Sequence, residues 1–298
     1  MMMNERQPTV QQHFVPQTYL RGFSSDKRTI YGFDLLDFKQ IDRPIPIKSV
    51  CYQNDLYEIK DEDDNYVSRN HLENYLAGFE NQYQIYFSKL NKKICPENRN
   101  TLTFLTGEEI TFWKIFIALQ MVRIPEVISG GTEVVKDVLL DGKDSNQAKA
   151  IFLLQILPFF KELTPDDKNA FFAVLNPIID MTIAVAVDPF DSLFTSDHPV
   201  YCFAPDFRNG VYEEITFCIS TRLVFKLFNN RVDKVYKRNN LAYLSEDDVL
   251  TIKKSIAYSA SRWIYSKKAL TEKDLKIVRQ ARDDKDQDGC TTNTTARS

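Results

Sequence analysis

Apolar and polar side chains alternate with helical periodicity between residues 69 and 90, which is the clearest pattern in the chain. Apolar and aromatic side chains recur there every three or four positions, and polar ones fill the opposite face. The apolar positions are Leu72, Tyr75, Leu76, Phe79, Tyr83, Tyr86, Phe87 and Leu90. This spacing predicts an amphipathic helix that buries an aromatic stripe. Glu73 and Glu80 lie two turns apart on one flank of the stripe, either at the edge of a cleft or as ordinary surface carboxylates.

A second helix is predicted over residues 106–123. It opens with a capping-box pattern, a threonine followed three positions later by a glutamate, and Pro125 disfavours helical backbone beyond its end. The stretch 113–121 is apolar on almost every side apart from Lys114 and Gln120. A helix of this composition is typical of the centre of a domain, because it has no polar face to offer to water.

Shorter patterns on either side complete an α+β outline. Runs of β formers bounded by turn residues predict strands near 29–34, 45–47, 56–59, 181–187, 192–195, 200–203 and 217–227. Periodic segments and caps predict further helices near 132–140, 146–162, 165–176 and 245–263. The order of these segments predicts a helical middle, about 68–176, flanked by N-terminal strands and by a C-terminal antiparallel β region with a closing helix.

The apolar pattern stops after Arg282, where Asp, Lys, Gln, Gly, Thr and Asn dominate. A segment of this composition cannot bury enough apolar surface to offset the entropy of ordering it. We therefore expect a disordered polar tail over 283–298 and a single α+β domain over 1–282. A chain of 298 residues fits this division, since single hydrophobic cores stop growing at roughly 250–300 residues.

Composition excludes several classes of protein. The formal net charge is −3, so no excess of basic residues points to nucleic acid as a bulk partner. The 5 cysteines are scattered without a C-x-x-C pair, which argues against a disulfide framework or a cysteine zinc site and favours a reducing cytoplasm. The first residues lack the apolar run of a signal peptide. No apolar window is long enough to span a bilayer, so we expect no association with a membrane.

Motifs for common cofactors are also missing. The sequence contains no Walker loop, dinucleotide-binding glycine fingerprint, G-x-S-x-G elbow or H-E-x-x-H pair. The run from Asp284 to Gly289 begins like an EF-hand loop, but position twelve is Thr295 in place of glutamate. We therefore assign no metal site, and the sequence leaves the cofactor open.

Candidate chemistry concentrates near two of the 3 histidines. His71 borders the apolar stripe and fits a packing or surface position. His13 lies in an aromatic and polar leader that precedes the first strand, and His198 lies in a tight polar turn between two apolar strands. An imidazole can donate or accept a proton near neutral pH. His13 and His198 are therefore the positions at which the sequence most readily supplies proton transfer.

Several motifs occur along the chain in a recognisable order. They are H-x-x-P-x-x-Y-L-R-G-F at 13–23, the strand Ile30-Tyr31-Gly32-Phe33-Asp34, the paired glutamates Glu73 and Glu80, Arg123-Ile124-Pro125, and Thr195-Ser196-Asp197-His198-Pro199. From His13 to about Lys267 the chain resembles the bacterial domain-of-unknown-function family DUF 4238. The family pattern often carries Asn where this chain has His198, so the resemblance implies no role for an imidazole there. It implies a shared fold unit and a set of important motif residues, but no activity.

The motif residues could assemble a site for a phosphate-containing substrate. The catalytic candidates are His13 as general acid or base, with Asp197 and Glu80 to orient it or to hold a metal. The substrate-binding candidates are Arg21, Arg123, Thr195 and Ser196, of which the two arginines can bind anionic oxygens bidentately. As an alternative, the same residues form a buried polar network that fixes the leader against the second β region.

Two classes of function remain open. The first is an enzyme that acts on a phosphate-containing substrate, a nucleic acid or a nucleotide, and the family resemblance suggests a bacterial defence or mobile-element setting. The second is a non-catalytic protein-interaction module whose polar motifs are structural. Geometry separates the two classes. Convergence of His13, Glu80, Arg123 and Asp197 in a solvent-reachable cleft favours the enzyme, and their dispersal or burial in the core favours the interaction module.

Overall fold

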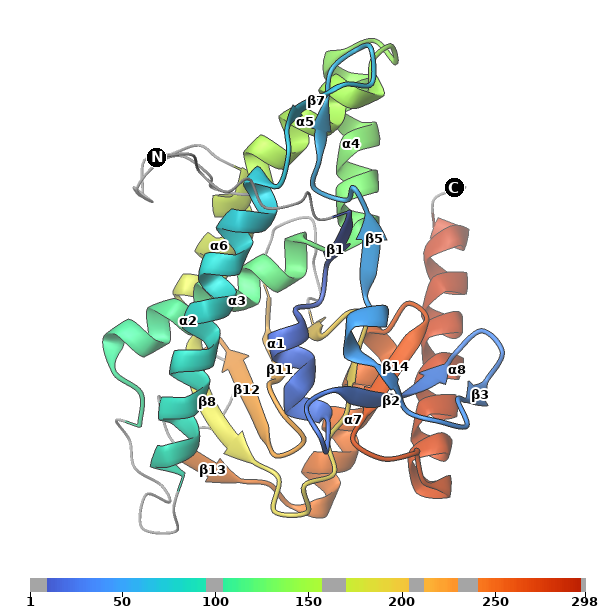
Figure 1. The fold of residues 1–298 in the computed structure, drawn as a ribbon. Helices are drawn as coiled ribbons and strands as arrows, with labels where there is room; N and C mark the ends of the chain where they lie inside the picture. Colours follow the sequence, from blue (N-terminus) through green and yellow to red (C-terminus); the bar gives the residue numbers. More distant parts are fainter. Residues whose placement is uncertain (1–9, 95–103, 157–169, 204–211, 230–240, 296–298) are drawn as a thin grey trace.

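The fold is α+β, with a helical middle between two β regions, as the sequence predicts (Figure 1). The structure, a computed structural model, describes residues 10–94, 104–156, 170–203, 212–229 and 241–295. Its helices are α1 (Gln17–Leu20), α2 (His71–Lys93), α3 (Gly107–Val122), α4 (Pro125–Leu139), α5 (Ser145–Ile156), α6 (Ala170–Ile179), α7 (Glu246–Ser259) and α8 (Glu272–Thr295), with 3-10 turns η1 (Arg21–Phe23) and η2 (Ile47–Ser49). Its strands are β1 (Gln11–His13), β2 (Thr29–Asp34), β3 (Lys39–Gln40), β4 (Ile45–Pro46), β5 (Tyr52–Asn54), β6 (Ile59–Lys60), β7 (Tyr66–Ser68), β8 (Thr182–Val187), β9 (Thr195–Ser196), β10 (Val200–Phe203), β11 (Glu214–Cys218), β12 (Leu223–Phe228), β13 (Leu241–Tyr243) and β14 (Trp263–Ser266).

The C-terminal half contributes a sheet with the strand order β10-β11-β12-β8-β13. Neighbouring strands are antiparallel except β13, which pairs with β8 in parallel. Every residue of β8 and β12 is buried, which confirms the prediction of a buried strand in the apolar run at 181–187. Trp113 of α3 contacts Phe225 of β12, with ring centroids 4.7 Å apart. The predicted central helix α3 therefore packs against this sheet.

A second sheet joins segments that are far apart in the sequence. Its order is β3-β2-β14-β9, and β4 pairs with β2 as well. β14 thus lies between the N-terminal strand β2 and the strand β9. The sequence places Trp263 in the closing helix, which is wrong: α7 ends at Ser259, and Trp263 opens β14. Pairing along the whole of β14 satisfies its backbone polar groups and outweighs the local helical spacing.

The leader folds as β1, α1 and η1 and enters the core. Tyr19 and Phe23 are fully buried, and the Tyr19 hydroxyl donates to the carbonyl oxygen of Cys218 at 2.6 Å. A Cβ atom at Gly22 would lie 2.6 Å from the carbonyl oxygen of Ile219, closer than real Cβ contacts come. Glycine is therefore required where η1 passes the connection between β11 and β12, so packing explains Tyr19, Gly22 and Phe23 of the leader motif.

The helical middle follows the predicted pattern, with one shifted start. α2 buries its aromatic stripe, and the Tyr83 ring stacks on Phe116 of α3 with centroids 4.9 Å apart. α3 opens with the predicted capping box between Thr106 and Glu109. α4 begins at Pro125, about two turns before the predicted start, because proline is preorganised for the first turn of a helix.

Two predicted helices, 146–162 and 165–176, correspond to α5 and α6. α5 begins at Ser145 and α6 ends at Ile179, close to the predicted limits. Residues 157–169 hold the predicted end of the first helix and the predicted start of the second, and they lie outside the described residues.

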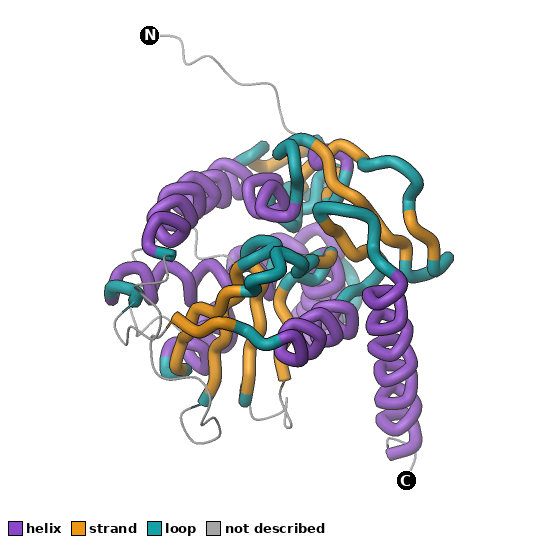
Figure 2. Tube along the Cα trace, turned by 90° about the horizontal axis from the view of Figure 1, so that it is seen from below, coloured by secondary structure: helices purple, strands orange, loops and turns teal. Residues whose placement is uncertain are grey.

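Helix α8 runs from Glu272 to Thr295 and so extends past residue 282, where the domain is predicted to end. The division into a domain over 1–282 and a disordered tail over 283–298 stays a prediction. α8 lies beside α7, as Figures 1 and 2 show. Lys254 of α7 pairs with Asp284 at 2.6 Å, and Lys285 donates to the carbonyl oxygen of Ala260 at 3.0 Å. These contacts stabilise α8 beyond its last apolar turn. Extending an existing helix needs only one further backbone hydrogen bond per residue.

The described part of the chain contains no helix that combines the length and the apolar character needed to cross a bilayer. Among the same residues, the His, Cys, Asp and Glu side chains form no group of three or more that could hold a metal ion. Cys51, Cys202 and Cys218 are free thiols. Burial raises the pKa of each of them, so all three stay protonated at neutral pH.

Candidate functional site

Arg123 is the centre of a buried polar cluster between the leader and the helices. It directly follows α3, and its side chain is only 2% exposed. Its guanidinium donates to the backbone oxygen of His13 at 2.6 Å and to the Tyr57 hydroxyl at 3.1 Å. Glu80 of α2 pairs with the same guanidinium at 3.3 Å. These bonds tie β1, α2 and the end of α3 together, so the guanidinium is engaged inside the protein.

Glu73, the other glutamate on this flank of α2, faces the same cluster without an ion pair. Its Oε2 atom is buried and has no hydrogen-bond partner among the described residues. Burial raises the pKa of Glu73 to about 7; the positive charge of Arg123 opposes this rise, and the negative charges of Glu80 and Glu58 add to it. The paired glutamates thus differ in state, since one is held in an ion pair and the other titrates near neutral pH.

The side chain and the backbone of His13 contact different residues. The ring Nε2 atom lies 3.3 Å from the carbonyl oxygen of Lys48. Burial lowers the pKa of His13, the hydrogen bond to Lys48 opposes this, and the charge of Arg123 lowers the pKa further. The ring is therefore neutral at pH 7, with Nε2–H donating and Nδ1 left as an acceptor.

Asp197 organises a second buried polar cluster. Its carboxylate accepts backbone N–H bonds from Ser261 at 2.9 Å, Arg262 at 2.8 Å and Trp263 at 2.9 Å. Burial raises the pKa of Asp197, although these N–H donors act in the opposite direction. The carboxylate therefore shapes the turn that leads from α7 into β14.

The two hydroxyl residues before Asp197 also bond within the protein. Thr195 Oγ1 lies 2.7 Å from the hydroxyl of Tyr19, which links β9 to the leader. Ser196 Oγ donates to the backbone oxygen of His198 at 2.7 Å. Both Thr195 and Ser196 are fully buried, so their side chains are closed to a substrate in solution.

The structure thus distributes the site residues predicted from sequence over three places. The first cluster contains His13, Glu80 and Arg123, and the second contains Thr195, Ser196 and Asp197. Within the described ranges, no hydrogen bond or ion pair joins the two clusters. Arg21 belongs to neither, because it lies on η1 with an exposed side chain.

A partly exposed acid–base pair lies beside the second cluster. Nε2 of His198 is 3.0 Å from Oε2 of Glu126, and Ser261 Oγ donates to the other carboxylate oxygen at 3.0 Å. The bond from His198 is the largest cause that lowers the pKa of Glu126 to about 2, against the effect of burial. Sequence reasoning missed Glu126. Its signal was an acidic residue in the first helical turn, directly after the Arg-x-Pro motif.

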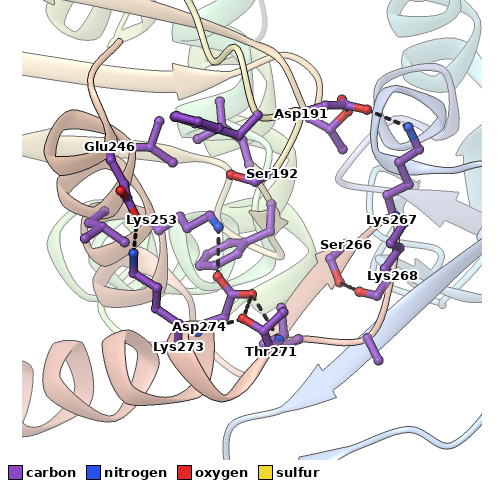
Figure 3. A pocket seen from close by; sticks show the side chains of 18 residues that line it. Asp191, Ser192, Glu246, Lys253, Ser266, Lys267, Lys268, Thr271, Lys273 and Asp274 are labelled. Atoms are coloured by element: carbon purple, nitrogen blue, oxygen red, sulfur yellow. Dashed lines mark hydrogen bonds and ion pairs between the residues drawn. The ribbon is translucent and has the colours of Figure 1, made fainter.

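A cavity lined by lysines lies between residues 190–194, α7 and the start of α8 (Figure 3). Its volume is about 490 Å³. The charged side chains that line this lysine pocket are Lys253, Lys267, Lys268, Lys273, Asp191, Glu246 and Asp274. None of the site residues predicted from sequence lines it, because its walls come from four separate segments and no single motif spans them.

The pair of Lys253 and Asp274 belongs to the framework of the lysine pocket. Their charged atoms are 2.8 Å apart, and the side chains are 7% and 13% exposed. Burial acts to raise the pKa of Asp274, but the bonds from Lys253 and Thr271 outweigh it and lower the pKa. Thr271 and Asp274 also cap the start of α8. This pair therefore holds α8 against α7.

The other lysines of the pocket are more exposed. Lys267 pairs with Asp191 at 2.7 Å, and Lys273 pairs with Glu246 (Figure 3). Lys268 has an exposed side chain, and it forms no ion pair in the described part of the chain. The lysine pocket therefore presents two loosely paired ammonium groups and one that is unpaired.

The remaining wall of the lysine pocket is apolar. It consists of Phe190, Leu193, Phe194, Val249, Leu250, Ala269 and Leu270. Phe190 is 59% exposed, which is unusual for a large aromatic side chain. An exposed aromatic ring thus adjoins the exposed lysines.

The order of the motifs and the α+β fold agree with a family match. The profile of the family described as "Protein of unknown function (DUF4238)" matches residues 11–269, so the chain belongs to this family. This confirms the resemblance found in the motifs. No curated protein is significantly similar to the chain, and no solved structure matches it significantly either. The matched range includes Lys267 and Lys268 of the lysine pocket, whereas Lys273 lies beyond it.

Proposed function

We propose that this protein binds a phosphate-containing ligand of the nucleotide class in the lysine pocket. The single observation that carries the proposal is the lining of this cavity, in which exposed lysines adjoin an exposed aromatic ring. Ammonium groups bind phosphate oxygens through charge-assisted hydrogen bonds, and a ring such as that of Phe190 offers a stacking surface for a base. The volume of 490 Å³ falls in the range usual for small-ligand sites, ~300–1,000 Å³.

The exposed ion pairs of the pocket oppose such a ligand only weakly. Their side chains are between 33% and 64% exposed, and pairs of this exposure contribute only ~0–1 kcal/mol. A hydrogen bond to a charged group contributes ~1.5–3 kcal/mol. A phosphate that binds Lys267, Lys268 and Lys273 therefore gains more binding free energy than is lost when the two surface ion pairs break.

Two helix N-termini add positive potential to the lysine pocket. Glu246 is the first residue of α7, and Thr271 directly precedes α8; both line the cavity. The N-terminal end of a helix carries a partial positive charge that favours anions. The 4 lysines and 3 acids of the lining leave a net charge of +1 (4 − 3). All of these contributions have the sign that a phosphate needs.

The contacts of the two polar clusters support a structural role for the motif residues. Arg123 and Asp197 are buried, and each joins elements that are distant in sequence. A phosphate in solution would have to displace Glu80 and the backbone of His13 to reach Arg123. We therefore place ligand binding in the lysine pocket and assign no catalytic step to His13, Glu80 or Asp197.

The experiment is a calorimetric titration of the protein with ATP, AMP and adenosine. We expect ATP to bind most tightly and adenosine to bind weakly, because the lysines contact phosphate. The double variant Lys267→Ala with Lys268→Ala should weaken ATP binding about tenfold or more. The matched control removes two exposed lysines of α2, Lys89 and Lys92, and should leave the affinity unchanged. Release of phosphate from ATP, measured in the same samples, reports whether the ligand is also turned over.

The outcomes that would contradict the proposal are equally specific. Equal affinity for ATP and adenosine would exclude recognition of phosphate. An equal loss of affinity in the pocket variant and in the control would mean that only the overall charge matters. Phe190→Ala should weaken AMP but not inorganic triphosphate, and the same loss for both would exclude stacking of the base.

A second function, binding of a basic amphipathic segment of a partner protein, is favoured by another cavity. This groove has a volume of 860 Å³ and lies between the β6–β7 hairpin, α2 and α5. Its apolar lining includes Ile59, Val67, Leu72 and Leu154. Its acidic lining consists of Asp61, Glu62, Asp63 and Asp144, against a single lysine, Lys60. An apolar floor with acidic sides complements a helix that has one leucine face and one lysine face.

The groove is tested with two synthetic helical peptides that share a leucine face. One carries lysine and the other glutamate on the polar face. We expect the lysine peptide to bind and Val67→Asp to weaken it, since Val67 is 65% exposed on the groove and tolerates a polar replacement. Equal binding of the two peptides, or no effect of Val67→Asp, would remove this second function.

A further inference from the structure

The exposed lysines of the lysine pocket lie at its two ends. Lys267 pairs with Asp191 at one end, and Lys273 pairs with Glu246 at the opposite end (Figure 3). Lys268 follows Lys267 in the chain and forms no ion pair in the described part of it, so it adds a cation to the first end. Exposed ion pairs are weak. The ammonium groups at both ends are therefore available to an anionic ligand.

The middle of the pocket is occupied by a buried ion pair. The ammonium group of Lys253 lies there, 2.8 Å from the Asp274 carboxylate (Figure 3). The two side chains are only 7% and 13% exposed. Burial acts to raise the pKa of Asp274, but the bonds from Lys253 and Thr271 outweigh it and lower the pKa, so the carboxylate is ionised at neutral pH. A phosphate in the middle would therefore meet a negative charge whose counterion is already engaged.

We propose that the lysine pocket selects nucleotides that carry phosphate on both the 3′ and the 5′ oxygen of the ribose. In such a nucleoside 3′,5′-bisphosphate the two phosphates leave the sugar in different directions, so one can bind Lys267 and Lys268 while the other binds Lys273. Ammonium groups bind phosphate oxygens through charge-assisted hydrogen bonds. This specificity depends on the proposed function, since it narrows the ligand of the same site.

The uncharged body of such a nucleotide suits the middle of the pocket. The Phe194 ring lies there, with its centroid 5.9 Å from the Lys253 ammonium group, and Leu193 and Val249 line the same cavity. A chain of phosphates on one ribose oxygen, as in ADP or ATP, reaches the second end only by passing the Asp274 carboxylate. Two phosphates on separate oxygens avoid that repulsion and leave the nucleoside beside apolar surface.

The test is a calorimetric titration of the full chain with adenosine 3′,5′-bisphosphate, ADP and ATP. We expect the bisphosphate to bind about tenfold more tightly than ADP or better, because bonds to charged groups form at both ends. It should also bind at least as tightly as ATP, which has nearly the same charge at neutral pH and one phosphate more. Lys273→Ala should weaken the bisphosphate about tenfold or more and remove its advantage over ADP. Lys273 is 58% exposed, so the thermal midpoint of this variant should stay unchanged.

The matched control is Lys276→Ala. Lys276 is exposed on the same helix, three residues after Lys273, but it does not line the pocket, so the affinities should not change. Equal affinity for the bisphosphate and ADP, weaker binding of the bisphosphate than of ATP, or an unchanged bisphosphate affinity in Lys273→Ala would each overturn the inference, while binding of ATP would still support the proposed function. An equal loss in Lys276→Ala would overturn it too, because only the overall charge would then matter. If none of the three nucleotides binds, both proposals are wrong.

Discussion

Replacing Glu73 with glutamine tests how the protein holds a carboxyl group beside Arg123. Burial, with no partner for Oε2, raises the pKa of Glu73 from 4.5 to about 7. The folded protein therefore binds this proton more tightly than the unfolded chain does. Folding stability accordingly falls as the pH rises through the interval from about 4.5 to about 7. The loss is absent in acid and complete above neutral pH.

The size of the effect follows from the two pKa values. Full ionisation of a carboxyl group with this pKa difference lowers the free energy of unfolding by ~3 kcal/mol. Of this, ~1 kcal/mol is already lost at about pH 5, so ~2 kcal/mol is lost between about pH 5 and pH 8. Glutamine does not titrate. Glu73→Gln should therefore gain up to ~2 kcal/mol over the wild type between these two pH values.

The assay is urea denaturation of the wild type and of two variants at about pH 5 and pH 8. The matched control is Glu80→Gln, on the same helix and beside the same arginine. Glu80 pairs with the buried guanidinium of Arg123, so its loss should destabilise the protein at both pH values by ~1–3 kcal/mol. Equal destabilisation by Glu73→Gln at both pH values would mean instead that Glu73 is a paired carboxylate in the folded protein.

Three further changes test the packing of the motifs and of α8. Gly22→Ala places a Cβ atom 2.6 Å from the carbonyl oxygen of Ile219, so overpacking should cost ~1–3 kcal/mol in calorimetry; a neutral effect would contradict this close approach. Asp197→Asn puts an NH₂ group against backbone N–H donors and should lower the free energy of unfolding by ~1–3 kcal/mol in urea, whereas unchanged stability would mean that the turn does not need the carboxylate. Deleting 283–298 removes contacts of α8 and should lower the thermal midpoint, while deleting 288–298 should not; equal midpoints would support the disordered tail that composition predicts.

The helices and the buried strand β8 could be predicted because their signals are local. The aromatic stripe of α2 and the apolar run of β8 each lie within one short window of sequence. The starts of α3 and α7 depend on Thr106 and Ser245, whose side chains accept a bond from a backbone N–H three residues away. The family could be identified for a related reason, since its motifs are short and keep their order along the chain.

Tertiary structure decided the features that depend on distant partners. β14 has a sequence that fits the end of a helix, but it pairs with β2, more than two hundred residues away. By sequence alone Arg123 fits an anion site or a buried polar network, and the fold surrounds it with His13, Tyr57 and Glu80. The lysine pocket likewise draws its walls from four separated segments. Periodicity along the sequence reflects only how a residue relates to its chain neighbours. The partners of a buried charge or of a central strand depend on which segments the whole fold brings together.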